Sequence, residues 1–225
     1  MYNIDFSVLL DNYKAILNGL YITIFISVIS SLLAFFIGTV FVYLRTSPLK
    51  KLQKSMDFFI NCIRNIPLLI VIYIFYKGLP SLGIVFNAIT CGILALSFYT
   101  GAYISDALLS GINAVPEEHT QTAKALGLSR FQSFIYVIYP QALRYSIFIL
   151  GSQFMNLIKN SSLVSFIAVT DIFYVTYKGI ADSYRIYEYF ILAIVVYCTL
   201  AGFALLLTNI CNKAFKLKST EVVKT

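Results

Sequence analysis

Polar and charged side chains interrupt the apolar stretches of this chain as short runs. The first run is Arg64-Asn65-Ile66-Pro67, inside an apolar segment. An arginine within an apolar membrane span costs at least about 2.5 kcal/mol at mid-depth, so such a residue commonly serves a function. Pro67 lacks the N–H that a helix needs and predicts a kink. Two interpretations are open: a polar hinge beside a water-filled path, or an arginine that reaches the interface next to a packing kink.

A second polar run, Lys159-Asn160-Ser161-Ser162, follows a later apolar segment. The Lys159 ammonium and the hydroxyl groups could bind a carboxylate. A lysine at this place could also cap the negative end of a helix. Asp106 lies near the exit of a third apolar segment, where water at the membrane interface could satisfy its carboxylate.

The residue patterns of common enzymatic sites are missing from the sequence. Its one histidine, His119, lies in a polar stretch, and its four cysteines have no C-x-x-C spacing that would indicate a metal site or a disulfide framework. The sequence contains no G-x-x-x-x-G-K-[ST] motif for ATP, no H-E-x-x-H and no G-x-S-x-G. These observations argue against a membrane enzyme, and energy from ATP would have to come from another chain.

The longest polar run covers residues 115–143 and predicts two helices joined at a glycine. Pro116 suits the first turn of the first helix, because its missing N–H costs nothing there. Gly127 suits the position after that helix, where the chain adopts a left-handed conformation. Ser129 and Gln132 have the spacing of a capping box that opens the second helix.

The second helix of this hairpin is expected to be amphipathic and to end at Pro140. One face carries an apolar stripe at helical spacing, formed by Phe131, Phe134, Ile135 and Ile138. A polar hairpin between membrane spans is a natural docking surface for a soluble partner. An interfacial hairpin without a partner would show the same pattern.

The composition places the chain in a membrane. Of its 225 residues 59% are hydrophobic and only 12% are charged, and the mean hydropathy is +0.82. A helical span needs about 20 residues, so we expect an all-α, polytopic membrane protein in one domain with about five transmembrane helices. The expected spans are 18–44, 56–76, 84–106, 145–159 with a short segment at 161–177, and 189–212.

Two of these spans carry small residues at four-residue spacing, which predicts close packing against another helix. The first set is Ser30, Ala34 and Gly38, and the second is Ser97, Gly101 and Ser105.

Lysine and arginine are distributed unevenly between the segments that join the spans. The positive-inside rule then places the N-terminus outside and the hairpin and the C-terminus in the cytoplasm. The net charge of +7 therefore reflects membrane topology rather than nucleic-acid binding. The cytoplasmic set is Arg45, Lys50, Lys51, Lys54, Lys124, Arg130, Arg144, Lys213, Lys216, Lys218 and Lys224, against Lys14, Lys77, Lys178 and Arg185 outside.

The hairpin resembles the cytoplasmic coupling loop of ATP-binding-cassette (ABC) importer permeases of the polar-amino-acid type. The family pattern E-A-A-x-x-x-G stands here as Gln121-Thr122-Ala123-Lys124-Ala125-Leu126-Gly127, followed by Ile138-Tyr139-Pro140. Three other runs are similar to family motifs: residues 64–69, 101–103 and 159–163. Asp106 and Asp171 stand where the family usually has glutamate.

This resemblance implies the transmembrane domain of a type I ABC importer, which moves a polar amino acid across the bacterial cytoplasmic membrane. It implies three partners: an ATPase dimer that binds ATP-Mg, a second permease subunit and an extracytoplasmic solute-binding protein. The chain itself would need no cofactor and bind no nucleic acid. The implied ATPase interface is Gln121, Thr122, Ala123, Lys124, Leu126, Gly127, Leu128 and Arg130. The implied candidates for the translocation path are Arg64, Asn65, Pro67, Tyr103, Asp106, Lys159, Ser161 and Ser162.

A secondary transporter that works without ATP is the main alternative, and a structural scaffold is another. The sequence shows no internal repeat that would supply the second half of such a transporter, and the polar hairpin favours a permease that couples to a partner.

Overall fold

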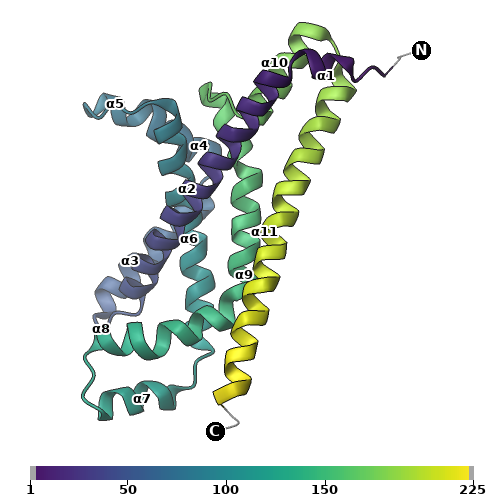
Figure 1. Cartoon of the computed structure of the whole chain (residues 1–225). Coiled ribbons are helices and arrows are strands. Elements are labelled where there is room, and N and C mark those ends of the chain that lie inside the picture. Colours follow the sequence, from purple (N-terminus) through teal and green to yellow (C-terminus); the bar gives the residue numbers. More distant parts are fainter. Residues whose placement is uncertain (1–3, 223–225) are drawn as a thin grey trace.

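The computed structural model describes residues 4–222, and within them the chain forms helices and turns but no strand (Figure 1). The N-terminal helix lies at one end of an elongated bundle and the polar hairpin lies at the other. Of the expected cytoplasmic charges, Lys224 falls outside the described residues. The elements are α1 (Ser7–Asp11), α2 (Tyr13–Arg45), α3 (Lys50–Asn65), α4 (Leu68–Tyr73), the π turn η1 (Ile74–Gly78), α5 (Leu79–Ser81), α6 (Ala88–Asn113), α7 (Glu117–Ala125), α8 (Arg130–Ser133), the π turn η2 (Phe134–Ile138), α9 (Tyr139–Asn160), the 3₁₀ segment η3 (Ser161–Ile167), α10 (Ile172–Ser183) and α11 (Ile186–Val222).

Four helices are long and apolar enough to cross a membrane, and a bent pair makes a fifth candidate. This agrees with the expected all-α fold of about five spans. The bounds differ from the expectation, because each of the four helices extends beyond the expected span at one end or both. The four helical candidates are 13–45, 88–113, 130–167 and 186–214.

The fifth candidate is broken at Pro67. The pair of helices 50–65 and 68–81 bends by 101° at this residue. Pro67 adopts an extended conformation with ψ 132°, so α3 stops before it and α4 starts after it. The predicted kink at Pro67 is confirmed, and the expected second span over 56–76 lies within this bent pair.

α2 and α6 cross in close contact through the two predicted stripes of small residues. Gly38 leaves room for Ile104 and for the backbone of Gly101 on α6. The Ser97 hydroxyl donates to the Ser30 carbonyl at 3.3 Å, which satisfies a buried polar group across the helix pair. The prediction of close packing from these stripes is confirmed.

A proline follows each of the two π turns of the chain's described part. Tyr139 donates its N–H to the carbonyl of Phe134, five residues earlier, and Pro140 follows. Leu79 makes the same bond to Ile74 ahead of Pro80. The wider turn accommodates a proline ring that would clash with the carbonyl of the preceding turn. The expectation that Pro140 ends the helix is therefore wrong, since α8, η2 and α9 run on through it.

The expected short segment at 161–177 is a 3₁₀ segment followed by α10. Asp171 caps α10 by accepting the N–H of Tyr174 at 2.9 Å, and the Tyr197 hydroxyl donates to it at 3.1 Å. The Thr23 hydroxyl of α2 accepts the N–H of Ile172 at 3.0 Å. Asp171 is fully buried, so these hydrogen bonds satisfy its carboxylate inside the protein rather than at the membrane interface.

The Gly38 crossing gives a prediction for stability. A Cβ at this position would lie 2.5 Å from Ile104 Cγ2 and 2.9 Å from the Gly101 carbonyl oxygen. Such overpacking typically costs about 1–3 kcal/mol. We expect Gly38→Ala to lower the melting temperature of the detergent-purified protein by several degrees.

The matched control is Gly202→Ala on α11, because nothing lies within 4 Å of a Cβ there. This variant should melt at or above the wild-type temperature, since alanine is the better helix former. Equal melting of Gly38→Ala and wild type would show that the crossing is not close-packed.

Candidate functional site

A polar cavity of about 360 Å³ lies between α6 and α9. Every residue that lines it carries a polar side chain, although both helices belong to candidate spans. Hydrocarbon does not solvate such groups, so this face must border water or another polar surface. The lining residues are Tyr99, Thr100, Tyr103, Gln153, Asn156, Lys159 and Asn160.

Helical spacing brings these residues together. On α9, Gln153, Asn156 and Asn160 recur every three or four residues and so share one face. On α6, the hydroxyls of Tyr99 and Tyr103 lie 3.2 Å apart. The two rings are tilted by 47° to each other with their centroids 5.1 Å apart, and they form the aromatic wall of the cavity.

Arg64 joins this wall from the end of α3. Its guanidinium lies 5.0 Å from the centroid of the Tyr103 ring, and the Tyr103 hydroxyl donates to the Arg64 carbonyl at 3.1 Å. The guanidinium also forms an ion pair with Asp106. Arg64 thus has partners within the protein, while 34% of its side chain stays exposed. Its Nε is buried and has no hydrogen-bond partner in the described part of the chain.

Asp106 belongs to a larger ionic cluster. Arg45, the last residue of α2, donates to Asp106 and, at 2.7 Å through its Nε, to Asp57 of α3. Arg45 also bonds the Ser105 hydroxyl at 3.2 Å, and its side chain is only 8% exposed. Two arginines and two aspartates therefore join α2, α3 and α6 with no net charge.

The sequence analysis missed Arg45 and Asp57 as members of this cluster. It assigned Arg45 to a cytoplasmic loop because lysines and a proline follow it. The available signal was Asp57 itself, an acidic residue within the expected second span that called for a cationic partner.

The structure does not bring all path candidates to the cavity. Tyr103 and Lys159 line it, and Arg64 and Asp106 adjoin it through Tyr103. The hydroxyls of Ser161 and Ser162 instead donate to carbonyls of α9, at 2.7 and 2.8 Å. In this structure Ser161 and Ser162 therefore lie at the end of α9 and do not line the cavity, because their hydroxyls bind carbonyls one turn earlier in the helix.

Asn65 and Pro67 are exposed at the break between α3 and α4. The Asn65 amide donates to the Asn61 carbonyl at 2.7 Å, and neither residue lines the cavity. Their role in this structure is to end α3 and redirect the chain.

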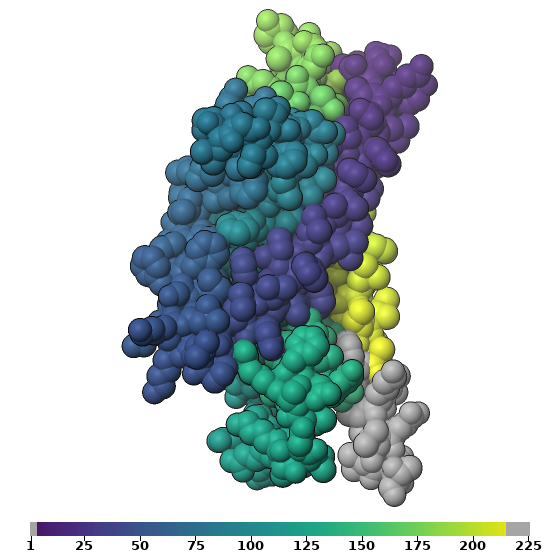
Figure 2. Space-filling model, turned by 90° about the vertical axis from the view of Figure 1, so that its left-hand side faces the viewer, coloured from purple at the N-terminus to yellow at the C-terminus, as the bar shows by residue number. Residues whose placement is uncertain are grey.

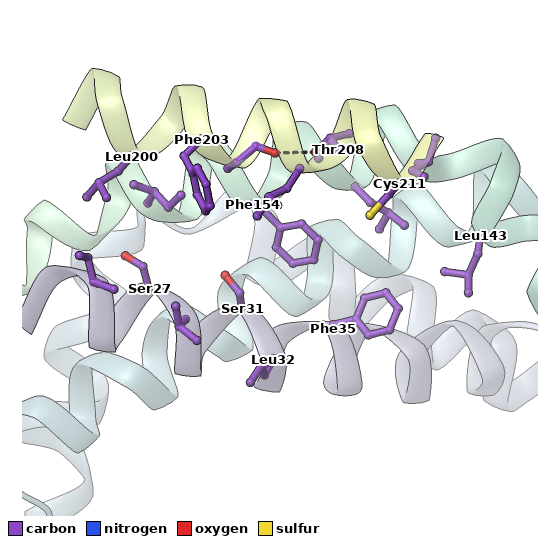
Figure 3. A pocket seen from close by; sticks show the side chains of 18 residues that line it. Ser27, Ser31, Leu32, Phe35, Leu143, Phe154, Leu200, Phe203, Thr208 and Cys211 are labelled. Atoms are coloured by element: carbon purple, nitrogen blue, oxygen red, sulfur yellow. Dashed lines mark hydrogen bonds between the residues drawn. The ribbon is translucent and has the colours of Figure 1, made fainter. Parts of the chain in front are cut away.

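A larger groove of about 730 Å³ lies between α2, α9 and α11, and its chemistry is different (Figure 3). The rings of Phe35, Phe154 and Phe203 occupy the space between these helices. Its few polar groups include Thr208, whose hydroxyl already donates to the Ala204 carbonyl at 2.9 Å. An apolar groove of this kind suits hydrocarbon, so the smaller polar cavity is the better candidate for a polar solute.

The hairpin forms the projecting end of the molecule (Figure 2). α7 ends in a Schellman motif: Leu128 donates to the Ala123 carbonyl at 3.1 Å, and Gly127 donates to the Lys124 carbonyl at 3.0 Å. Gly127 has a φ of +74°, as predicted. Ser129 and Gln132 form the predicted capping box, but Pro116 caps α7 rather than lying within its first turn.

The expected interface residues divide into two groups. Gln121, Thr122, Lys124 and Leu126 are exposed, and Leu126 shows 74% of its surface. Ala123 is 2% exposed because it faces the second helix of the hairpin, so its expected contact with a partner is wrong for this structure. Gly127 is exposed at the turn and Leu128 is half-buried.

Arg130 is directed within the chain. It donates to the Tyr43 carbonyl at 2.7 Å, and its guanidinium lies 4.3 Å from the Tyr43 ring centroid. The Tyr43 ring also meets Phe134 at 5.0 Å. The hairpin is therefore fastened to the end of α2 as well as to α9.

Known proteins share both the sequence and the fold of this chain. The family model of the binding-protein-dependent transport system inner membrane component matches residues 30–216. The probable glutamine ABC transporter permease protein GlnM of Bacillus subtilis is 33% identical over 86% of this chain and 90% of its own length. The arginine transport system permease protein ArtQ of the same organism is 31% identical over 97% of this chain and all of its own length.

A crystal structure of an amino acid ABC transporter with histidines has a chain of the same fold. It superposes with a TM-score of 0.82 at 25% identity, and covers 95% of this chain and 100% of its own. The stand-alone transporter is therefore not favoured. The chain belongs to the family of binding-protein-dependent transport system inner membrane components, as a permease subunit of an amino-acid ABC importer.

Proposed function

We propose that the cavity between α6 and α9 is part of the path that a polar amino acid follows through this permease subunit. The single observation that carries the proposal is the cavity's wholly polar lining on two candidate spans. The ionic cluster beside the cavity links α2, α3 and α6 through three ion pairs. These pairs hold the three helices together beside the proposed path.

The exposed face of α7 is the proposed docking site of the ATPase subunit. Docking there uses exposed polar residues, while the buried Ala123 and the Schellman motif hold α7 to the next helix. The ATPase dimer, which would bind ATP-Mg, is a separate partner in this proposal, together with a second permease subunit and an extracytoplasmic solute-binding protein. The names of the relatives support these partners, since they describe ABC transporter permeases.

The proposed orientation has the N-terminus outside and the hairpin in the cytoplasm of a bacterial cell. Lys50, Lys51 and Lys54 begin α3 at the hairpin end of the bundle (Figure 1), in accord with the positive-inside rule. Ser81, next to the turn after α5, lies at the opposite end.

Single-cysteine labelling tests this orientation. In a background without the four native cysteines, Ser129→Cys and Ser81→Cys place exposed thiols at opposite ends of the bundle. We expect a membrane-impermeant maleimide to label Ser81→Cys on intact cells, and Ser129→Cys only after the membrane is opened. Labelling of Ser129→Cys from outside would reverse the orientation and remove the docking site from the ATP-containing side.

Coupling is tested at the hairpin turn. Gly127→Val places a β-branched side chain at φ +74°, which disfavours this turn by roughly 1–2 kcal/mol. We expect the variant to insert into the membrane but to lose most of the ATPase stimulation by loaded binding protein in proteoliposomes.

Gly83→Val is the matched control for Gly127→Val. Gly83 has a φ of +81° and, like Gly127, no atom within 4 Å of an added Cβ, but it lies away from the hairpin. The same backbone strain there should leave stimulation near the wild-type level. Equal loss in both variants would assign the effect to strain rather than to docking.

Asp106 is the third test, because it pairs with Arg45 and Arg64 together. Asp106→Ala leaves the half-buried Arg64 without its ion pair and removes one of the two carboxylates that pair with the buried Arg45, and an uncompensated charge inside a protein is destabilising. We expect a lower melting temperature and slower amino-acid uptake in proteoliposomes.

Two further variants separate charge from packing at this position. Asp106→Glu keeps the charge and should keep most of the uptake. The double variant Asp106→Ala with Arg64→Ala should recover part of the lost stability, because it removes the uncompensated charge. If Asp106→Ala transports and melts like wild type, the cluster has no role in the path.

A further inference from the structure

The charges around the polar cavity are unbalanced. Lys159 is the one charged residue among those that line it, and none of the described lining residues carries a carboxylate. The Lys159 side chain is exposed and forms no ion pair with any residue of the described part. The cavity therefore offers a free cation to a ligand.

Asp106, the acidic residue of the ionic cluster that adjoins the cavity, does not cancel the positive charge of Lys159. Asp106 is bound by Arg45 and Arg64, and Arg45 is bound by Asp57. These four charges balance among themselves, and both carboxylate oxygens of Asp106, the aspartate that adjoins the cavity, are paired with arginines. The net charge of the cavity with its adjoining cluster is positive.

The remaining lining groups are neutral hydrogen-bonding groups. The amides of Gln153, Asn156 and Asn160 each offer donors and an acceptor. The hydroxyls of Tyr99 and Tyr103 offer acceptor lone pairs, because Tyr103 donates its proton to the Arg64 carbonyl and the two hydroxyls share a hydrogen bond. Such groups can bind an uncharged amide or a carboxylate of a ligand, but none of them brings the negative charge that pairs best with a guanidinium or an ammonium side chain.

We propose that this cavity binds neutral or acidic polar amino acids and rejects cationic ones. Lys159 binds the ligand's α-carboxylate, and the amides of α9 with the hydroxyls of α6 bind its polar side chain. This inference rests on the proposed function of the cavity as part of the path. It makes the permease a second filter for the side-chain charge, after any choice made by a binding protein.

The test measures amino-acid binding to the permease without a binding protein, so that the selectivity of the binding protein does not affect the measured affinities. Radiolabelled L-glutamine, L-glutamate and L-arginine are each equilibrated with the permease–ATPase complex in lipid nanodiscs. We expect L-glutamine and L-glutamate to bind at least ten-fold more tightly than L-arginine. Lys159→Gln should weaken L-glutamine binding about ten-fold, and Lys159→Glu should raise L-arginine binding above that of L-glutamine.

Two variants control for unspecific effects. Lys159→Arg keeps the cation and should retain the wild-type order of the three ligands. Lys178→Gln removes an exposed lysine on α10 that does not line the cavity, and it should change nothing. Thermal melting of each variant in the same nanodiscs shows that it is folded.

Three outcomes would overturn the inference: L-arginine binding as tightly as L-glutamine in wild type, unchanged binding in Lys159→Gln, or no binding of any of the three. The proposed function is tested by a different variant. If Asp106→Ala blocks uptake while Lys159→Gln leaves binding unchanged, the cavity remains part of the proposed path, and only the proposed charge selectivity is wrong.

Discussion

The structure depends on one constraint: polar groups within the hydrocarbon layer must find their partners inside the protein. The crossing of α2 and α6 meets it with a serine hydroxyl on a carbonyl of the other helix. Asp171 meets it by capping α10 and accepting from Tyr197. Arg45 meets it with two aspartates from two other helices. The polar cavity differs from these places, since seven residues with polar side chains line one hollow there. This is where we propose that a polar solute binds.

Local rules of helix chemistry made much of this fold predictable from the sequence. Gly127 at +74° and the capping box of Ser129 and Gln132 follow from the chemistry of helix ends, which needs no knowledge of distant residues. The stripes of α2 and α6 were predictable for a similar reason, because small residues at four-residue spacing permit only one kind of contact. Tyr103 was found through a family resemblance, whereas Lys159 also stands out in the sequence as the start of a polar run after an apolar segment.

Features that depend on distant neighbours could not be predicted in this way. Arg45 looks like a loop residue until Asp57 and Asp106 are known to lie beside it. Ala123 looks like a contact for a partner until the second helix of the hairpin is seen to cover it. Pro140 stays within a helix because the π turn ahead of it widens the backbone, and this choice depends on packing around Phe134 and Tyr139. In each case tertiary structure overrides a sound local rule.

The same elements connect the two proposed sites mechanically. α8, η2 and α9 follow one another without a break from Arg130 in the hairpin to Lys159 at the cavity, and the ribbon turns where it leaves the hairpin and enters the bundle (Figure 1). Arg130 also binds Tyr43 through a hydrogen bond and a cation–π contact, and Tyr43 lies two residues before Arg45 of the ionic cluster. In the proposed mechanism, a displacement of the hairpin would be passed to the cavity along α9 and to the cluster along α2. α9 supplies one face of the cavity, and α2 supplies Arg45, the central arginine of the ionic cluster. A partner docked on α7 could therefore change the cavity and the cluster without contacting them.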